Sequence, residues 1–186
     1  MINILNVLVR ILIHSFVYTQ VKMSKPSIYS NFYLANFITI DGIQYKSSEH
    51  YFQSHKFIYP GASNRSLEYA ELIRTCNTPY QCKMLGTQKK NGRYGWQKQI
   101  NELIDKYNDL KIRNDWEEVK DTIMWEALWY KFTQNIDLYN RIMTDDDNFV
   151  GIQFSKDLYW GMNRNFQGLN RLGELRLILK YRLLGI

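Results

Sequence analysis

Residues 47–57 read Ser-Ser-Glu-His-Tyr-Phe-Gln-Ser-His-Lys-Phe, and the interpretation of both fold and function starts from this stretch. In a helix of 3.6 residues per turn, Glu49, Gln53 and Lys56 stand at i, i+4 and i+7 and share one face. A carboxylate, an amide and an ammonium would then point in the same direction. We therefore expect a short amphipathic helix whose polar face carries chemistry.

The start of this helix favours an ionised Glu49. Ser47 or Ser48 is a suitable N-cap, which places Glu49 in the first turn. Free backbone N–H groups and the positive end of the helix dipole stabilise a negative charge there. Glu49 is therefore a candidate base or nucleophile. The same pattern also fits a glutamate that only stabilises the helix N-terminus and faces solvent, and the residues alone leave both interpretations open.

The composition is that of one globular domain of ordinary size. The chain has 186 residues, of which 45% are hydrophobic, 23% are charged and only 3 are proline. Such values exclude a fibrous or intrinsically disordered chain. Aromatic residues reach 15%. They are core material first, although the same side chains stack on bases and sugars when they line a cleft.

The charge balance favours an anionic partner. The formal net charge is +6 and the isoelectric point is near 9.2. Phosphorylated small molecules or nucleic acid would suit it. The basic residues are scattered, with small groupings at Lys89-Lys90 and between Arg171 and Arg182, so no dedicated nucleic-acid arm is expected.

The cysteines and histidines predict no metal site and no cofactor. Cys76 and Cys82 are the only cysteines and do not have the spacing of metal ligands. His50 and His55 are five residues apart, so on a helix they point roughly 140° from each other. We expect reduced thiols in a cytoplasmic protein.

Residues 1–22 are more apolar than the rest of the chain. Arg10 and His14 interrupt the apolar stretch, and no small-residue cleavage site follows, which argues against a signal peptide and against a membrane span. We expect a dispensable extension, with Met23 as a possible true start and residues 23–186 as the domain. An interfacial amphipathic helix is the alternative. No membrane partner and no obligate protein partner are predicted.

The elements expected along the domain are mainly helical. Two short apolar runs around Asp41-Gly42 predict a β-hairpin with a type I′ turn, in which both central residues have positive φ. Helices are expected at 67–74, 79–86, 100–107, 115–130, 135–143 and 170–183. Asp115 and Asn170 are the expected N-caps of two of them. Residues 149–154 are a strand candidate, and the acidic residues 145–147 are expected to form a solvated turn.

Six motifs occur in one order over about residues 28–183. They are Ser30-Asn31-Phe32-Tyr33, Ser48-Glu49-His50-Tyr51-Phe52-Gln53 with Lys56-Phe57, Asp115-Trp116 with Met124, Lys131-Phe132-Thr133-Gln134-Asn135, Asp157 with Trp160-Gly161, and Asn170-Arg171-Leu172-Gly173. No single motif is specific, but the ordered set resembles the NADAR family, also called the YbiA-like N-glycosidases.

The resemblance implies a compact, mainly α domain with small β-hairpins that hydrolyses N-glycosidic bonds of ribosyl compounds. Known family activities include cleavage of phosphoribosylamino-pyrimidine intermediates of riboflavin biosynthesis and removal of ADP-ribose from guanine. The family's functional positions fall on Glu49, Lys56, Trp116, Asp157 and Trp160. Gln53, Asn170 and Arg171 complete the expected substrate-binding set, with the Asn170 loop near the phosphate.

The chemistry of the reaction fits these residue types. Cleavage of a ribosyl C–N bond passes through an oxocarbenium-like state, which needs a carboxylate near C1′ and an acid near the leaving base. Glu49 suits the first role, and Asp157 suits the second if an apolar setting raises its pKa. Lys56 could hold the phosphate or attack an opened ribose aldehyde. Trp116 and Trp160 could stack on the base or belong to the core.

Two departures from the family pattern concern the substrate. Family members often have a Leu-Val-Glu pattern where this chain reads Phe149-Val150-Gly151-Ile152-Gln153, and Leu-Gly-Arg where it reads Leu85-Gly86-Thr87. Three functions stay open. They are an N-glycosidase of phosphoribosylamino-pyrimidines, an ADP-ribosyl-guanine hydrolase acting on nucleic acid, and a nucleotide-binding module without catalysis.

Overall fold

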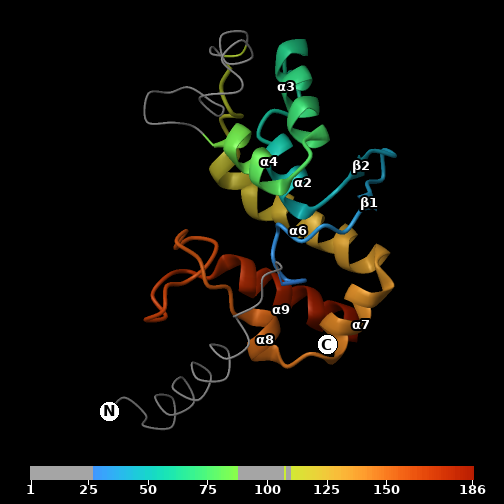
Figure 1. Cartoon of the computed structure of the whole chain (residues 1–186), viewed down its shortest axis with the longest axis vertical. Coiled ribbons are helices and arrows are strands. Elements are labelled where there is room, and N and C mark those ends of the chain that lie inside the picture. The colour runs from blue at the N-terminus through green and yellow to red at the C-terminus, as the bar shows by residue number, and fades with distance from the viewer. Residues whose placement is uncertain (1–26, 88–106, 108–109) are drawn as a thin grey trace. The chain divides into compact units, whose positions relative to one another are not determined.

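The structure, a computed structural model, describes residues 27–87, 107 and 110–186 (Figure 1). These residues divide into two compact units, one of residues 31–141 and one of residues 27–30 with 142–186. The extension expected at 1–22 and most of the helix expected at 100–107 lie outside the described residues. The single domain from 23 to 186 stays a prediction.

The described residues are mainly helical, which confirms the predicted fold class. The structure has one two-stranded antiparallel sheet, in which Phe37 pairs with Tyr45. The elements in chain order are β1 (Phe37–Ile38), β2 (Gln44–Tyr45), α2 (Ser48–Ser54), α3 (Asn64–Thr75), α4 (Pro79–Gly86), α6 (Trp116–Gln134), α7 (Ile136–Thr144), α8 (Asp147–Gly151) and α9 (Arg171–Leu184).

The hairpin is confirmed, but the expected type I′ turn is wrong. Gly42 has φ of 81°, whereas Asp41 does not have a positive φ. The Gly42 N–H donates to the Thr39 carbonyl at 2.9 Å, and the Thr39 N–H donates to the Ile43 carbonyl at 3.0 Å. The connection is therefore a three-residue loop that needs only one left-handed residue. Asp41 stays outside the left-handed region, and its carboxylate accepts the Thr39 hydroxyl.

Helix α2 lies among α3, α4 and α6 in the unit of residues 31–141 (Figure 1). Ser47 is its N-cap, as predicted, and the Ser47 hydroxyl accepts the His50 N–H. All seven helical residues are buried, including Glu49 and Gln53 on the expected polar face. The polar side chains of α2 point into protein, where each must find partners from other elements.

Helices α3 and α4 begin and end close to the predicted residues. The Ser63 side chain caps α3, and Thr78 with Gln81 forms a capping box at the start of α4, where Pro79 occupies the first turn. Their inward faces meet in one apolar cluster of Phe57, Tyr69, Ala70, Ile73, Cys82, Leu85, Tyr107 and Leu110.

The predicted cap of α6 is wrong. Asp115 stands at the N-cap position of α6 but makes no side-chain cap, because its carboxylate accepts two hydrogen bonds from Arg113 at 2.6 and 2.8 Å. The charge-assisted pair outcompetes the cap.

The second unit differs from the expectation at residues 147–154. Asp147–Gly151 forms helix α8 rather than a strand, capped by the Asp146 side chain, and only Phe154 makes an isolated bridge, to Met162. The acidic residues are not a simple solvated turn, since Asp145 accepts the Tyr29 hydroxyl and Asp147 pairs with Lys180 at 2.7 Å.

Helix α9 buries an arginine. Leu172, Leu175 and Leu179 on this helix are buried. Arg176 on the same helix is fully buried and donates to the Tyr29 and Ile152 carbonyls and to the Gln153 side chain. Its Nε has no hydrogen-bond partner among the described residues, and burial lowers the pKa of Arg176 to about 9.

Within the described chain, no helix is both long and apolar enough to cross a membrane.

We predict that Gly42→Ala lowers the free energy of unfolding by about 1 kcal/mol, because Ala is strained at positive φ. Nothing lies within 4 Å of an added Cβ, so strain is the only expected effect. Urea denaturation measures it. Gly42→Asn should lose less, since Asn tolerates this conformation. Equal stability of Gly42→Ala and the wild type would contradict the turn described here.

We predict that Gln153→Glu raises the free energy of unfolding by about 1 kcal/mol, because the charged acceptor that it gives the buried Arg176 outweighs the loss of the hydrogen bond from Gln153 Nε2 to the Phe154 carbonyl. The matched control is Gln167→Glu on the exposed loop of the same unit, which should change stability by less than about 0.5 kcal/mol. Both are measured by denaturant titration at neutral pH. A Gln153→Glu variant no more stable than the control would show that Arg176 does not need a counterion.

Candidate active site

Glu49 is a buried carboxylate held by the first turn of α2. Its residue is only 5% exposed, and its Oε1 accepts a 2.8 Å hydrogen bond from Gln53 Nε2, one helical turn later. The Glu49 backbone N–H donates to the Asn31 carbonyl at 3.1 Å. A glutamate that faces solvent is therefore excluded. The geometry brings Glu49 and Gln53 together as the sequence predicted.

Lys56 lies just beyond α2, which ends at the C-cap His55. Its Nζ donates to the Gly86 carbonyl at 2.8 Å and lies 5.7 Å from the Phe52 ring centroid and 5.4 Å from that of Trp116. The ammonium is thus placed by a carbonyl and two aromatic faces rather than by helical periodicity.

Trp116 is a core residue with one face toward Lys56. It begins α6, is 6% exposed, and its ring centroid lies 4.9 Å from that of Phe52. Of the two interpretations left open by the sequence, burial in the core is the one that the geometry favours for Trp116.

Gly86 is a site neighbour that the sequence analysis treated only as a helix end. A Cβ at Gly86 would lie 2.1 Å from Gln53 Oε1, so only glycine leaves room for the Gln53 side chain. Its carbonyl binds Lys56. Gln53 Oε1 is itself buried without a hydrogen-bond partner among the described residues. The only available signal was the Leu85-Gly86 pair, noted above as part of a family pattern.

His50 fixes α2 from its other side and adds no charge. Its Nδ1 lies 2.8 Å from the Ser47 hydroxyl and its Nε2 lies 3.1 Å from the Cys76 carbonyl. Burial lowers the pKa of His50, so the neutral imidazole is favoured at neutral pH. The arrangement as a whole offers a desolvated carboxylate, an amide that holds it, and an ammonium bound over aromatic rings.

Asp157 and Trp160 lie on a loop of the other unit. Asp157 is exposed, and its Oδ1 accepts the backbone N–H groups of Tyr159 at 3.1 Å and Trp160 at 3.3 Å. The apolar setting expected for Asp157 is therefore wrong, because the carboxylate organises its own turn in contact with water. The Trp160 ring is half-buried and packs edge-on against Tyr159, with centroids 5.0 Å apart.

The start of α9 is tied to the same loop. The backbone N–H groups of Asn170, Arg171 and Leu172 donate to the carbonyls of residues 161, 159 and 160. A helix N-terminus binds a phosphate mainly through free backbone N–H groups. At the start of α9 these three N–H groups already donate to backbone carbonyls, so they do not offer such a site.

Asn170 and Arg171 have structural partners. Asn170 has φ of 54° and does not cap α9 with its side chain, contrary to the prediction. Instead the amide bonds the Gly151 carbonyl at 2.7 Å and the Gln153 N–H at 3.0 Å. Arg171 pairs with Glu174 at 2.6 Å on the surface. The roles of Asn170 and Arg171 in substrate binding stay predictions.

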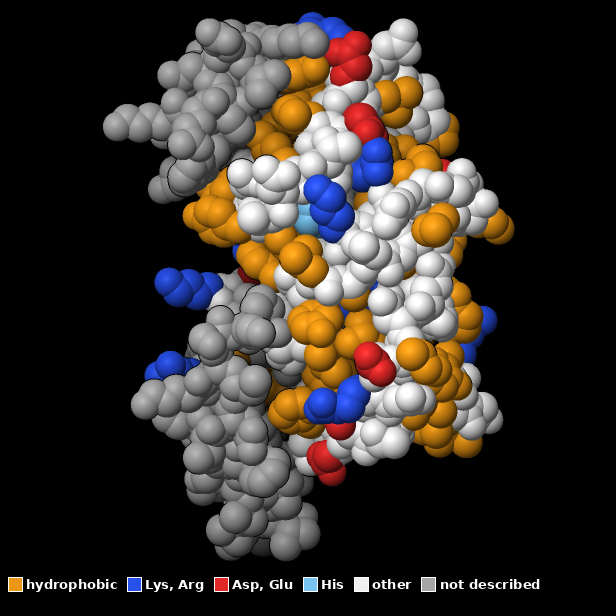
Figure 2. All heavy atoms as spheres, turned by 45° about the vertical axis from the view of Figure 1, so that its right-hand side comes forward, with side chains coloured by type: hydrophobic (Ala, Val, Ile, Leu, Met, Phe, Trp, Pro, Cys, Tyr) orange, Lys and Arg blue, Asp and Glu red, His pale blue; other side chains and the backbone are white. Residues whose placement is uncertain are grey.

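A cavity of about 520 Å³ lies in this unit. Its lining has two cations, apolar and polar side chains and no acidic residue, and consists of Phe154, Ser155, Lys156, Leu158, Met162, Asn163 and Arg164. Elsewhere on the described surface, the face in Figure 2 shows basic side chains scattered among acidic and apolar ones, without a continuous basic stripe.

Among the described residues, no cluster of three or more His, Cys, Asp or Glu residues could hold a metal ion.

The chain is similar to known proteins over most of its length. The family model described as the NADAR domain matches residues 17–183. N-glycosidase YbiA of Shigella flexneri is 30% identical over 83% of this chain and 80% of its own length. The chloroplastic riboflavin biosynthesis protein PYRR of maize is 29% identical over 78% of this chain, which spans only 21% of that protein.

One solved structure agrees with these sequences. The NMR structure of Escherichia coli YbiA has a TM-score of 0.60 and 27% identity, and the match covers 84% of this chain and 77% of that one. The resemblance inferred from six ordered motifs is thereby confirmed, and this chain belongs to the NADAR family.

Proposed function

We propose that this chain is an N-glycosidase that hydrolyses the N-glycosidic bond of phosphoribosylamino-pyrimidine intermediates of riboflavin biosynthesis. The names of its relatives support both parts, since they include N-glycosidase YbiA and a riboflavin biosynthesis protein. The observation that carries the proposal is the buried Glu49 carboxylate, held by Gln53 in the same unit as the Lys56 ammonium.

Glu49 is proposed to act at C1′ of the ribose. As the C–N bond lengthens, positive charge develops on the ring, and an adjacent carboxylate stabilises it or activates the attacking water. The hydrogen bond from Gln53 fixes Oε1 and so holds the carboxylate in one orientation. Burial strengthens this electrostatic contribution, because few water molecules screen it.

Lys56 is proposed to bind the phosphate. An ammonium that donates to the Gly86 carbonyl and lies near two aromatic rings is a cation fixed in place, which suits an anionic group. Attack on an opened ribose is less well supported, because a nucleophilic lysine must be neutral and these contacts stabilise the cation.

Asp157 is proposed to assist the leaving base or a water molecule through Oδ2, since Oδ1 is used by its own turn. Trp160, Asn170 and Arg171 remain proposed substrate contacts. Replacement of Asp157 by Asn keeps the turn acceptor and removes the acid, so it separates a chemical role from a structural one.

Removal of ADP-ribose from guanine in nucleic acid is the second candidate. The cavity lined by Lys156 and Arg164, with no acidic residue, favours it, because a diphosphate or a nucleic-acid backbone would find two cations there. A binding module without catalysis is the remaining alternative and predicts ligand binding with no bond cleavage.

We predict that Glu49→Gln lowers kcat at least 100-fold while the fold stays intact, because the amide still accepts from Gln53 but carries no charge. Release of free base from the two phosphoribosylamino-pyrimidines measures turnover, and circular dichroism measures the fold. The control is Glu117→Gln on α6, whose side chain is 78% exposed. The turnover and the circular dichroism of Glu117→Gln should match those of the wild type. Wild-type turnover by Glu49→Gln would exclude the assignment.

We predict that Lys156→Glu with Arg164→Glu weakens binding of an ADP-ribosylated oligonucleotide at least 10-fold if nucleic acid is the substrate. Loss of two phosphate contacts also flattens the dependence of binding on salt. Hydrolysis of the free pyrimidine intermediates should not change. A variant that cleaves both substrates as the wild type does would remove the argument for nucleic acid.

A further inference from the structure

The two cysteines of the chain meet where α3 ends and α4 begins. Cys76 is the C-cap of α3 and is half-buried, whereas Cys82 lies in α4 and is fully buried. The Cys76 thiol donates to the Leu72 carbonyl at 3.3 Å, and the Cys82 thiol donates to the Ile73 carbonyl at 3.1 Å. The Ile73 carbonyl also accepts the Cys76 N–H at 3.2 Å. Both sulfurs therefore lie against neighbouring carbonyls in the last turn of α3.

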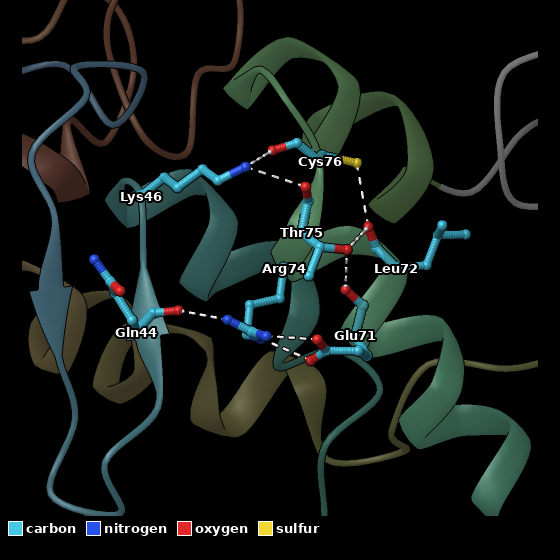
Figure 3. A network of polar contacts seen from close by, with 7 residues as sticks. All are labelled: Gln44, Lys46, Glu71, Leu72, Arg74, Thr75 and Cys76. Atoms are coloured by element: carbon cyan, nitrogen blue, oxygen red, sulfur yellow. Dashed lines mark hydrogen bonds and ion pairs between the residues drawn. The ribbon is translucent and has the colours of Figure 1, made fainter.

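The surroundings distinguish the two thiols. Lys46 Nζ donates to the Cys76 carbonyl at 2.8 Å and to the Thr75 carbonyl at 3.1 Å, which brings a cation to the end of α3 (Figure 3). The neighbouring Cys82 thiol and the charge of Lys46 lower the pKa of Cys76. The neighbouring Cys76 thiol and burial raise the pKa of Cys82. Cys76 is the accessible thiol that ionises first, and Cys82 is a neighbour within its reach.

We propose that Cys76 and Cys82 form a reversible disulfide when the protein meets a peroxide. The Cys76 thiolate attacks the O–O bond and becomes a sulfenic acid, and hydroxide leaves. The Cys82 sulfur then attacks the sulfenic sulfur, and its proton and the displaced hydroxide form water. In total, two thiols and one hydrogen peroxide give one disulfide and two waters. An external dithiol reverses the reaction.

The bond would act on the neighbourhood of Glu49. Cys82 and Gly86 are four residues apart on α4 and therefore share one face. Gly86 contacts Gln53 and binds Lys56. Because a disulfide of about 2.05 Å is shorter than any contact between two thiols, its formation must draw α4 toward Cys76. A displacement of this kind changes the position of the Gly86 carbonyl relative to Lys56.

We expect the oxidised protein to turn over substrate on the order of 10-fold more slowly than the reduced protein, since small misplacements of catalytic groups cost large factors in rate. The expected loss of turnover rests on the proposed function, whereas formation of the disulfide does not depend on it.

The full chain, reduced and freed of reductant, is treated with hydrogen peroxide and then alkylated. Trypsin cleaves after Arg74 and Lys83, so both cysteines fall in the peptide Thr75–Lys83. We expect this peptide to be two hydrogens lighter and not alkylated, and dithiothreitol to restore both thiols. Cys76→Ser should leave Cys82 reduced, and Cys82→Ala should leave Cys76 as a higher oxide.

Alkylation of both cysteines after peroxide treatment, or cross-linking only between two chains, would overturn the disulfide. Hydrogen exchange of the segment Pro79–Gly86 and of α2 in both redox states tests the displacement without any substrate. Unchanged exchange and unchanged turnover in a protein that does form the disulfide would overturn its effect on the site. Absence of turnover in the reduced protein would count against the proposed function alone.

Discussion

The hydrogen bond between Gln53 and Glu49 depends on a helix that is buried on every side, and much of the unit around it serves that burial. A buried carboxylate, imidazole and amide are costly unless each is hydrogen bonded. The neighbouring elements therefore have to end where their free backbone groups can form hydrogen bonds with α2. The Cys76 carbonyl at the end of α3 meets His50, and the Asn31 carbonyl meets the first turn of α2.

Cationic side chains elsewhere in the chain are stabilised in two different ways. Lys56 and Lys46 donate to carbonyls at the ends of α4 and α3, where the negative end of each helix dipole favours a cation. Arg176 is buried against carbonyls and an amide instead. Gln153 offers Arg176 an acceptor without a charge, so the buried cation is only partly compensated.

The sequence predicted those features whose causes are local. Ser47 as an N-cap, Pro79 in a first turn and the hairpin at Gly42 depend on neighbours within a few residues. The errors arise where another group competes for a side chain. Arg113, only two residues away, takes the carboxylate of Asp115, and the more distant 151–153 backbone takes the amide of Asn170, so neither side chain caps its helix. Lys56 was placed with Glu49 by helical period, yet its position is set by Gly86, thirty residues away.

Helix α2 also has a consequence for how the protein folds. Seven residues are too few for a stable isolated helix, because the cost of nucleation is spread over very few hydrogen bonds. It can persist only when α3, α4 and α6 surround it. The carboxylate of Glu49 should therefore reach its final setting late in folding, after the longer helices have docked. A partly folded chain could hold most of its helices and still lack the site.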